Sequence, residues 1–449
     1  MNILLPIETI NRELDFKLVL AGYLAGQGHQ IYIGQHDFLM RLVPSMNDGG
    51  IYIGKNIFNV DASEEKGEKY YFLKKNKFDI IYLNEEGAVF FKGEESMIER
   101  LEKLYNLNFF DENDHVCVWG NLQQKLEKRR STKVEIHCTG HPRFDLCKKE
   151  WRSLYETKVD KIKKTYKNFI LINGNFSAAN PGNGIEHYFN EEKMKDEKVR
   201  LEGISTFVYQ SGQLLSMVKL THHLASAFPE LNFIYRPHPS EDHNYYKILF
   251  AGAKNIHVKH DGNVINWILA SKLLLHDGCT TAIEATLAGI PVVNYKSNFN
   301  ADRDIWLPNQ MGVQISNFDE MISYIKKIEK EDLNSSIYPK KEEVLQYLYN
   351  FKGNSYEAFL KIIDPKIDKN KTNSKVPSLR IKQFFLEQSI RDFLIKILKP
   401  YKKKHLSYHN TKFYGFHEQD VNEKFKNISK ILNKKIIYKF HNSHLINIQ

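Results

Sequence analysis

Apolar and polar positions alternate along the first half of the chain in a way that predicts strands followed by helices. Residues 12–29 place Leu14, Leu18, Ala21 and Ala25 on one face of a helix. Short apolar runs have the length of buried strands: residues 2–7, 30–34, 78–83, 115–120 and 134–140. This alternation predicts a parallel sheet covered by helices.

A second set of strands and helices follows the charged segment at residues 145–167. Its helices are expected at residues 205–229, 263–271 and 279–289. Its strands are expected at residues 168–174, 231–239, 255–260, 272–278 and 290–296. Two consecutive Rossmann-like halves predict the GT-B architecture, an α/β fold in which two such domains face a central cleft. We expect the N-terminal domain over residues 1–160 and the C-terminal domain over residues 161–345.

The alternation ends near residue 338, and we expect a helical extension over residues 346–449. Residues 340–363 have a helical pattern, and residues 378–405 form an amphipathic helix that runs into a lysine cluster. That helix fits two placements, on an anionic membrane surface or packed against the protein's own body.

Charge and composition narrow the class of protein. The net charge of the 449-residue chain is +10, and residues 365–449 hold 19 Lys and Arg against 6 Asp and Glu, so all of the basic excess lies in the tail. An anionic membrane is the partner we favour over nucleic acid, because the chain has no nucleic-acid-binding motif. A lysine-rich tail that is solvated and binds no partner is the open alternative. We expect a cytoplasmic protein without a signal peptide or membrane-spanning helix. The scattered cysteines predict free thiols, with no disulfide or zinc site.

The segment "RPHP" places a histidine between two prolines at the end of a strand. Strand ends face the ligand crevice in open α/β sheets. The prolines restrict the backbone, so Arg236 and His238 are expected to be held in place. Both side chains can bind a phosphate and stabilise the negative charge of a leaving group.

A second strand end, "HDGCTT", leads directly into a helix. We expect Thr280 or Thr281 at the N-cap, with Glu284 completing a capping box. Free backbone N–H groups at a helix start favour phosphate. Asp277 and Gly278 form the preceding turn, so this whole stretch is a candidate donor-binding segment.

Two further loops carry polar residues at strand ends. "NEEG" places Glu85 and Glu86 after a strand of the first half, where one carboxylate could take a proton from a hydroxyl group. "NGNFSAAN" opens the second half and offers Asn175 for nucleotide or sugar contacts. His141 and Arg143 in "TGHPRFDL" are weaker candidates that could instead close the first domain.

Several of these segments together resemble the bacterial surface carbohydrate biosynthesis proteins, which are GT-B-like. They are "REL" with Asp15 and Lys17, "EEG", "TGHPRFD", "NGNFSAAN", "RPHP" and "HDGCTTAIEA". The resemblance covers about residues 1–330. It implies a role in the assembly of a cell-surface polysaccharide.

Three segments are also similar to the motifs of bacterial sialyltransferases and Kdo transferases. The counterparts are Glu85-Glu86-Gly87, His238-Pro239 and Thr280-Thr281, in the same order. By that resemblance, Glu86 or Glu85 is the base that activates the acceptor, and His238 and the threonines hold the CMP phosphate. The family's chemistry needs no metal ion or other cofactor.

The function expected from the resemblance is transfer of Kdo or another ulosonic or sialic acid from a CMP-activated donor to a glycan or glycolipid acceptor. "RPHP" and the D-G-x-x-T segment also resemble CDP-glycerol glycerophosphotransferases. A UDP-sugar transferase or a non-hydrolysing sugar epimerase shares the two-domain architecture. These alternatives remain open, as does the choice between inversion and retention.

Overall fold

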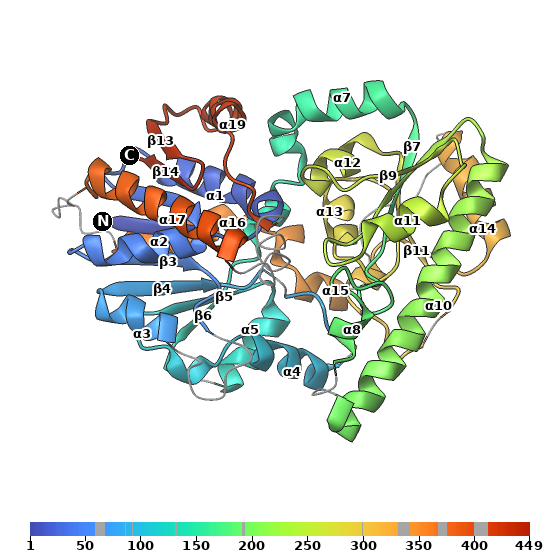
Figure 1. The fold of residues 1–449 in the computed structure, drawn as a ribbon, viewed down its shortest axis with the longest axis horizontal. Coiled ribbons are helices and arrows are strands. Elements are labelled where there is room, and N and C mark those ends of the chain that lie inside the picture. Colours follow the sequence, from blue (N-terminus) through green and yellow to red (C-terminus); the bar gives the residue numbers. More distant parts are fainter. Residues whose placement is uncertain are drawn as a thin grey trace. The chain divides into compact units, whose positions relative to one another are not determined.

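The computed structural model describes residues 1–58, 68–85, 87–91, 93–130, 133–190, 194–298, 300–330, 342–366, 375–398 and 412–449. The chain forms two compact units. The first comprises Met1–Gly87, Leu101–Leu146 and Gln346–Gln449, and the second comprises Ala88–Arg100 and Cys147–Leu345. Each unit is built on its own sheet, flanked by helices (Figure 1). The two Rossmann-like domains expected for the GT-B class are confirmed.

The first unit contains an eight-stranded sheet in the order β13-β14-β2-β1-β3-β4-β5-β6. Strands β1 to β6 are parallel. They span Asn2–Ile7, Gln30–Gln35, Gly50–Gly54, Phe78–Leu83, His115–Val118 and Glu135–Cys138. The sequence analysis did not predict β3, whose segment "GIYIG" begins and ends in glycine, a residue depleted in strands.

The tail completes this sheet instead of forming only helices. Strand β14 (Leu445–Ile448) pairs antiparallel with β2 and with β13 (Tyr438–Asn442). All of β14 is buried, so the hairpin covers an edge that β2 would otherwise expose. Residues 346–449, expected as a separate extension, thus belong to the first unit.

Helix α1 (Ile10–Leu24) is buried on almost every side, because the tail helix α19 (Glu418–Ile431) packs against it. Gly22 permits this contact: a Cβ atom there would lie 2.9 Å from Ile428 Cγ2. Other helices of the unit are α2 (His36–Leu42), α3 (Glu68–Lys75), α5 (Asn121–Arg130), α6 (Pro142–Asp145), α16 (Ser355–Ile363) and α17 (Ser378–Leu398).

The helical pattern at residues 340–363 is interrupted in the structure. Helix α15 (Glu342–Tyr347) ends before η5 (Tyr349–Phe351), and α16 follows. Asn350 is buried within this break, and its side chain bonds to both backbone groups of His141 and to Asp145. A buried amide needs hydrogen-bond partners, and Asn350 finds them in His141 and Asp145, more than 200 residues earlier. This tertiary contact therefore accounts for the break in the helix.

The second unit contains a six-stranded parallel sheet in the order β12-β11-β10-β7-β8-β9. Strands β7 to β12 span Phe169–Asn173, Asn232–Arg236, Ile256–Val258, Leu273–His276, Val292–Tyr295 and Val313–Ile315. The helices are α7 (Glu156–Tyr166), α8 (Ile185–Tyr188), α10 (Glu197–Ala227), α11 (His243–Leu249), α12 (Val264–Ala270), α13 (Thr281–Leu287) and α14 (Phe318–Glu329). Helix α4 (Glu94–Leu104) includes residues of both units.

Within the part of the chain that the structure describes, no helix has the length and apolar character needed to cross a membrane. The four cysteines are free thiols, as expected.

Candidate functional site

The order of strands in the second sheet changes direction beside β7. The chain adds β8 and β9 on one side of β7 and then crosses over to add β10, β11 and β12 on the other. Open parallel sheets bind ligands beyond the carboxyl ends of the strands at such a switch point. Asn175 follows β7, and Asp277 and Gly278 follow β10, so three predicted donor-binding residues flank this point.

A pocket of about 70 Å³ lies at the switch point and is lined by Asn175, Asp277 and Gly278. It is smaller than the roughly 300–1,000 Å³ typical of small-molecule sites, so it has room for one small group. Its other walls come from side chains that the sequence analysis did not single out: Phe91, Thr206, Tyr209, Gln210, Gln213, Arg303 and Ile305. Four of them lie on α10, a helix that the sequence analysis predicted without assigning it any site residue.

Asp277 is a buried acid at this pocket. Its Oδ2 accepts a hydrogen bond from Gln213 Nε2 at 2.7 Å. Burial, assisted by the charge of Asp304, raises the pKa of Asp277 to about 7. An acid with such a pKa can gain or lose a proton near neutral pH. Asp277 is therefore a candidate for proton transfer as well as for the donor contact that we predicted.

Arg303 supplies a cation to the same pocket. Its two terminal nitrogens bind both carboxylate oxygens of Glu202, at 2.6 and 2.9 Å, and Nη1 also donates to Thr206 Oγ1 at 2.8 Å. A guanidinium held by a bidentate pair has a defined orientation.

Arg236 lies at the end of β8, as the sequence predicts. It is buried, and its guanidinium donates hydrogen bonds to the backbone carbonyls of Asp261, at 3.0 Å, and Gly262, at 2.7 Å. Burial lowers the pKa of Arg236 to about 10, so the group remains charged at neutral pH. The two bonds to the loop after β9 hold this charge in place.

His238 is half-buried, and its ring is oriented by Ser240. The backbone N–H of Ser240 donates to Nδ1 of His238 at 3.3 Å, and the Ser240 hydroxyl lies 2.6 Å from the same nitrogen. We therefore assign Nδ1 as the acceptor and place the proton of the neutral ring on Nε2. In this tautomer Nε2–H can donate to a phosphate oxygen, which is the role that we predicted.

Glu241 was missed by the sequence analysis, although it stands only three residues after His238 in "HPSE". Its buried carboxylate accepts hydrogen bonds from the backbone N–H of Phe176, at 2.9 Å, and of His238, at 3.3 Å, and from the hydroxyl of Tyr246. Burial raises its pKa. Glu241 thus connects the loop after β7 to the loop after β8.

At α13 the structure confirms Thr280 as the N-cap, one of the two positions that we predicted, but the predicted capping box is wrong. Thr280 is the N-cap, yet its side chain makes no capping hydrogen bond, and Thr281 is already the first helical residue. The Thr281 hydroxyl accepts from Asn173 Nδ2 at 2.9 Å and donates to Cys279 Sγ at 3.1 Å. Glu284 is therefore one position too late for a capping box, and its buried charge acts on Arg236 instead.

The first sheet has a switch point of its own between β1 and β3. Glu8 follows β1 and Lys55 follows β3, and the two form an ion pair at 3.1 Å. Asn56 and Lys412 also bond to Glu8. Burial opposes the charge on Glu8, but these partners outweigh it and hold its pKa well below the ordinary value. None of these residues was predicted: Lys55 and Asn56 follow β3, which was missed, and Lys412 comes from the tail.

Glu85, after β4, belongs to a buried polar cluster in the same unit. Its Oε2 lies 3.0 Å from His141 Nε2, and its Oε1 lies 4.0 Å from Lys17 Nζ. Lys17 in turn pairs with Glu13 at 3.2 Å. The backbone N–H of Arg143 donates to Nδ1 of His141 at 3.1 Å, so Nε2 carries the ring proton and donates to Glu85.

This environment does not suit Glu85 to the role of base that we predicted. Its side chain has no solvent exposure. Burial alone would raise its pKa, but His141, Lys17 and Arg12 outweigh burial and hold the pKa well below the ordinary value. A carboxylate with a lowered pKa is a weak proton acceptor at neutral pH. Glu86, the other predicted base, lies outside the described residues, so its role stays a prediction.

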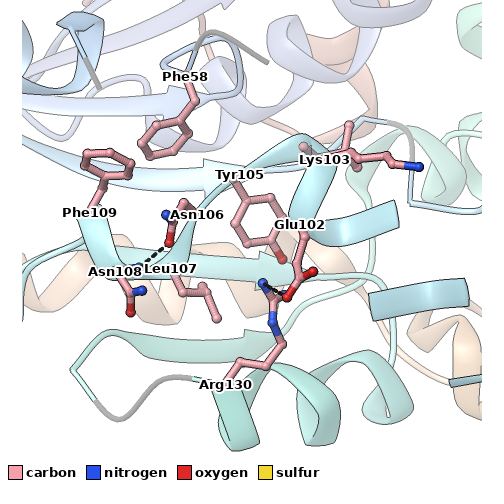
Figure 2. A pocket seen from close by; sticks show the side chains of 10 residues that line it. Phe58, Glu102, Lys103, Tyr105, Asn106, Leu107, Asn108, Phe109 and Arg130 are labelled. Atoms are coloured by element: carbon pink, nitrogen blue, oxygen red, sulfur yellow. Dashed lines mark hydrogen bonds and ion pairs between the residues drawn. The ribbon is translucent and has the colours of Figure 1, made fainter. Parts of the chain in front are cut away.

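Figure 2 shows a larger hollow in the first unit, of about 400 Å³, where Phe58, Tyr105 and Phe109 lie near Arg130 and Glu102. Arg130 Nη2 lies 3.4 Å from Glu102 Oε1. None of the predicted site residues lines this hollow. It is therefore separate from the site that the sequence motifs define.

No protein-family model matches the sequence, and no curated protein matches it.

Solved structures with a related arrangement include two UDP-GlcNAc 2-epimerases. The enzyme of Methanocaldococcus jannaschii, in complex with UDP-GlcNAc and UDP, is 10% identical with a TM-score of 0.47, over 81% of this chain and 99% of its own. That of Neisseria meningitidis, bound to UDP-GlcNAc, is 13% identical with a TM-score of 0.46, over 81% of this chain and its full length. The wall teichoic acid polymerase TagF is 10% identical with a TM-score of 0.46, over 82% of this chain and 89% of its own. At these values no activity is carried over from them.

Proposed function

We propose that this chain is a glycosyltransferase that binds a nucleotide-activated sugar in its second unit and serves the synthesis of a cell-surface polysaccharide. One observation carries the proposal. Three sequence segments, separated by up to about a hundred residues, place polar groups beyond the ends of the adjacent strands β8, β7 and β10, beside the switch point of that sheet. Such convergence is what binding of a phosphate-linked donor requires.

Each group has a role in the proposed reaction. Nε2–H of His238 donates to the leaving phosphate, and the charge of Arg236 stabilises it. Asn175, Gly278, Thr280 and Thr281 contact the donor, and Asp277 holds or releases a proton beside it. Glu284 balances the charge of Arg236. Glu86 activates the acceptor hydroxyl, and Glu85 positions His141 and Lys17 without taking a proton. The proposed chemistry uses no metal ion.

The donor that we propose is CMP-linked, with Kdo or another ulosonic or sialic acid as the sugar. This choice rests on the resemblance of "EEG", "HP" and the paired threonines to the motifs of sialyltransferases and Kdo transferases. Transfer of glycerol phosphate from CDP-glycerol, or chemistry on a UDP-sugar, is the alternative that the same fold allows.

A panel of nucleotides tests the proposal by thermal unfolding. We expect CMP and CTP to raise the melting temperature, and UDP and CDP-glycerol to leave it unchanged. A ligand at a hundred times its Kd adds about 2.7 kcal/mol. Each kcal/mol is worth about 2–4 °C for a unit of this size. Asn175→Ala should reduce the shift, whereas His187→Ala, an exposed histidine of the same unit, should not.

Each other outcome of that panel has a meaning. Stabilisation by UDP alone would replace the CMP donor with a UDP-sugar, and stabilisation by CDP-glycerol alone would favour glycerol phosphate transfer. A protein that no nucleotide stabilises would contradict the proposal as a whole.

We also propose that α17 rests on the anionic inner face of the plasma membrane. Two sides of this helix are apolar. Ile381 is buried, and Phe384 and Phe385 are half-buried on the side that contacts Arg41 and His444. A separate stripe at spacings of three and four residues is exposed by 45–61% and consists of Leu386, Ile390, Phe393, Leu394 and Ile397. The lysine-rich sequence "KPYKKKH" follows directly, which suits an anionic surface.

Vesicle flotation tests this surface. Because burying a phenylalanine or isoleucine side chain is worth about 1.5–3 kcal/mol, Phe393→Ser with Ile397→Ser should lower binding to phosphatidylglycerol vesicles at least tenfold. Ser389→Ala, off the stripe on the same helix, is the control. Unchanged binding of the double variant, or equal binding to purely zwitterionic vesicles, would refute the membrane contact. Point variants are needed because truncation of the tail would remove β13 and β14 from the sheet.

A further inference from the structure

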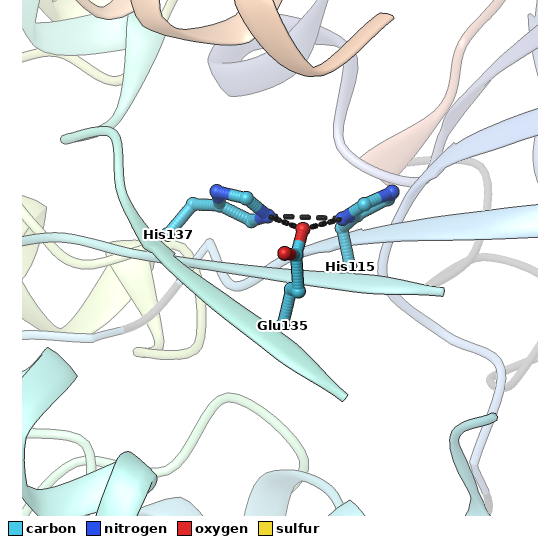
Figure 3. A group of neighbouring side chains, drawn as sticks. All are labelled: His115, Glu135 and His137. Atoms are coloured by element: carbon cyan, nitrogen blue, oxygen red, sulfur yellow. Dashed lines mark hydrogen bonds and ion pairs between the residues drawn. The ribbon is translucent and has the colours of Figure 1, made fainter. Parts of the chain in front are cut away.

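Two histidines and a glutamate converge at the edge of the first sheet. His115 begins β5, and Glu135 and His137 lie on the edge strand β6. The register pairs His115 with Glu135, so all three side chains lie on one face. Figure 3 shows the two rings and the carboxylate pointing toward a common centre.

The three ligand atoms lie close enough together to hold one metal ion. His115 Nδ1 lies 2.9 Å from His137 Nε2, and Glu135 Oε2 lies 3.4 Å from the first nitrogen and 3.3 Å from the second. Tetrahedral zinc with bonds of about 2.0–2.2 Å separates its ligands by roughly 3.3–3.5 Å. A zinc ion would therefore need the two nitrogens to part by only about half an ångström.

Hydrogen bonding alone leaves this cluster incompletely satisfied. A proton shared by the two rings forms a hydrogen bond between His115 Nδ1 and His137 Nε2 only, whereas a metal ion would bind both nitrogens and Glu135 Oε2. Lys366, the nearby cation, is paired with Asp79 at 3.5 Å.

We propose that His115, Glu135 and His137 bind a divalent transition-metal ion of the zinc type and that this ion fastens the edge strand β6 to β5. Imidazole nitrogen and carboxylate oxygen form a donor set that zinc prefers. Glu135 is exposed, so the fourth position is open to water. The three ligands lie where β5 and β6 begin, whereas Glu85 and His141 follow the ends of their strands. The ion would therefore have a structural role that is independent of the proposed transfer.

Zinc binding to the full-length chain tests this inference. After treatment with a chelator and its removal, we expect the protein to bind one equivalent of Zn²⁺ in calorimetry, and its melting temperature to rise. Co²⁺ should show the visible absorption of a four- or five-coordinate site. Loss of a direct ligand in His137→Gln should weaken binding by more than the roughly 10- to 100-fold that loss of an outer partner costs.

Two further variants make the result decisive. Glu135→Gln changes an exposed side chain, so the fold is retained, and it should weaken zinc binding and abolish the stabilisation. His187→Gln should bind zinc as the wild type does. Absence of zinc binding to the wild type, or wild-type affinity in both ligand variants, would overturn the inference. Because the readout is binding, neither result depends on the transferase activity.

Discussion

Replacing His238 by alanine is expected to lower the rate of transfer by about 100- to 1,000-fold, the usual effect of removing one hydrogen-bond donor to the charge that develops in a transition state. The ring is half-buried and lies in a loop, so the free energy of unfolding should change little. The measurement is sugar transfer from the CMP-sugar, together with surface polysaccharide in cells that carry the variant as their only copy.

His257→Ala is the matched control for this prediction. His257 lies on β9 of the same unit, and its ring bonds to Asn232 Oδ1 at 3.0 Å, away from the switch point. His238→Gln restores a donor near the position of Nε2 and should recover part of the rate. Wild-type polysaccharide in the alanine variant, with the fold retained, would exclude His238 from the site.

Replacing Glu85 by alanine is expected to destabilise the first unit by about 3–5 kcal/mol, because it leaves the buried partners of a charge without their acceptor. The substitution removes the acceptor of His141 Nε2–H and one of the two carboxylates near Lys17. Chemical unfolding followed by circular dichroism measures the loss. Glu85→Gln should be less destabilising, since the amide oxygen can still accept from His141.

Glu102→Ala is the control, because it removes an exposed charge instead of a buried one and should change the free energy of unfolding little. Glu102 is 58% exposed and pairs with Arg130 at 3.4 Å, and exposed pairs of this kind are worth about 0–1 kcal/mol.

The pH dependence gives an independent check on Glu85. The lowered pKa of Glu85 means that its contribution is present above the ordinary glutamate pKa, about 4.3, and is lost as the pH falls further. The difference between wild type and Glu85→Ala should therefore shrink at acid pH. A stable Glu85→Gln protein that has lost transfer would instead restore Glu85 as the base.

Most of the secondary structure follows from local patterns. The apolar runs at β1, β4, β7, β8 and β10 were predicted close to their observed bounds, and α1 was predicted over residues 12–29 but ends at Leu24. The failures have local causes too. Glycine at both ends concealed β3. The helical patterns at residues 340–363 and 378–405 led us to expect a helical tail, so the hairpin of β13 and β14 was missed.

The candidate site was predictable only in part. Strand ends marked by proline, glycine and charged residues led to Arg236, His238 and Asp277, because the carboxyl ends of parallel strands gather at one edge. Gln213 and Arg303 belong to no motif, and only packing brings them to Asp277 and to Glu202 on α10. Glu241 is close to His238 in the sequence, but its bond to Phe176 joins two distant loops. The capping box of α13 was mispredicted because threonine at either of two adjacent positions fits the pattern, and the helix has Thr280, not Thr281, as its N-cap.

The sequence by itself determined two α/β units and the polar residues at their strand ends, since apolar periodicity and turn residues act over a few positions. The tertiary structure alone decided that Glu85 is a buried partner of His141 and that the tail belongs to the first sheet. A buried charge takes its properties from whatever surrounds it. Here those partners are distant in the chain: 56 residues separate Glu85 from His141, and 404 separate Glu8 from Lys412.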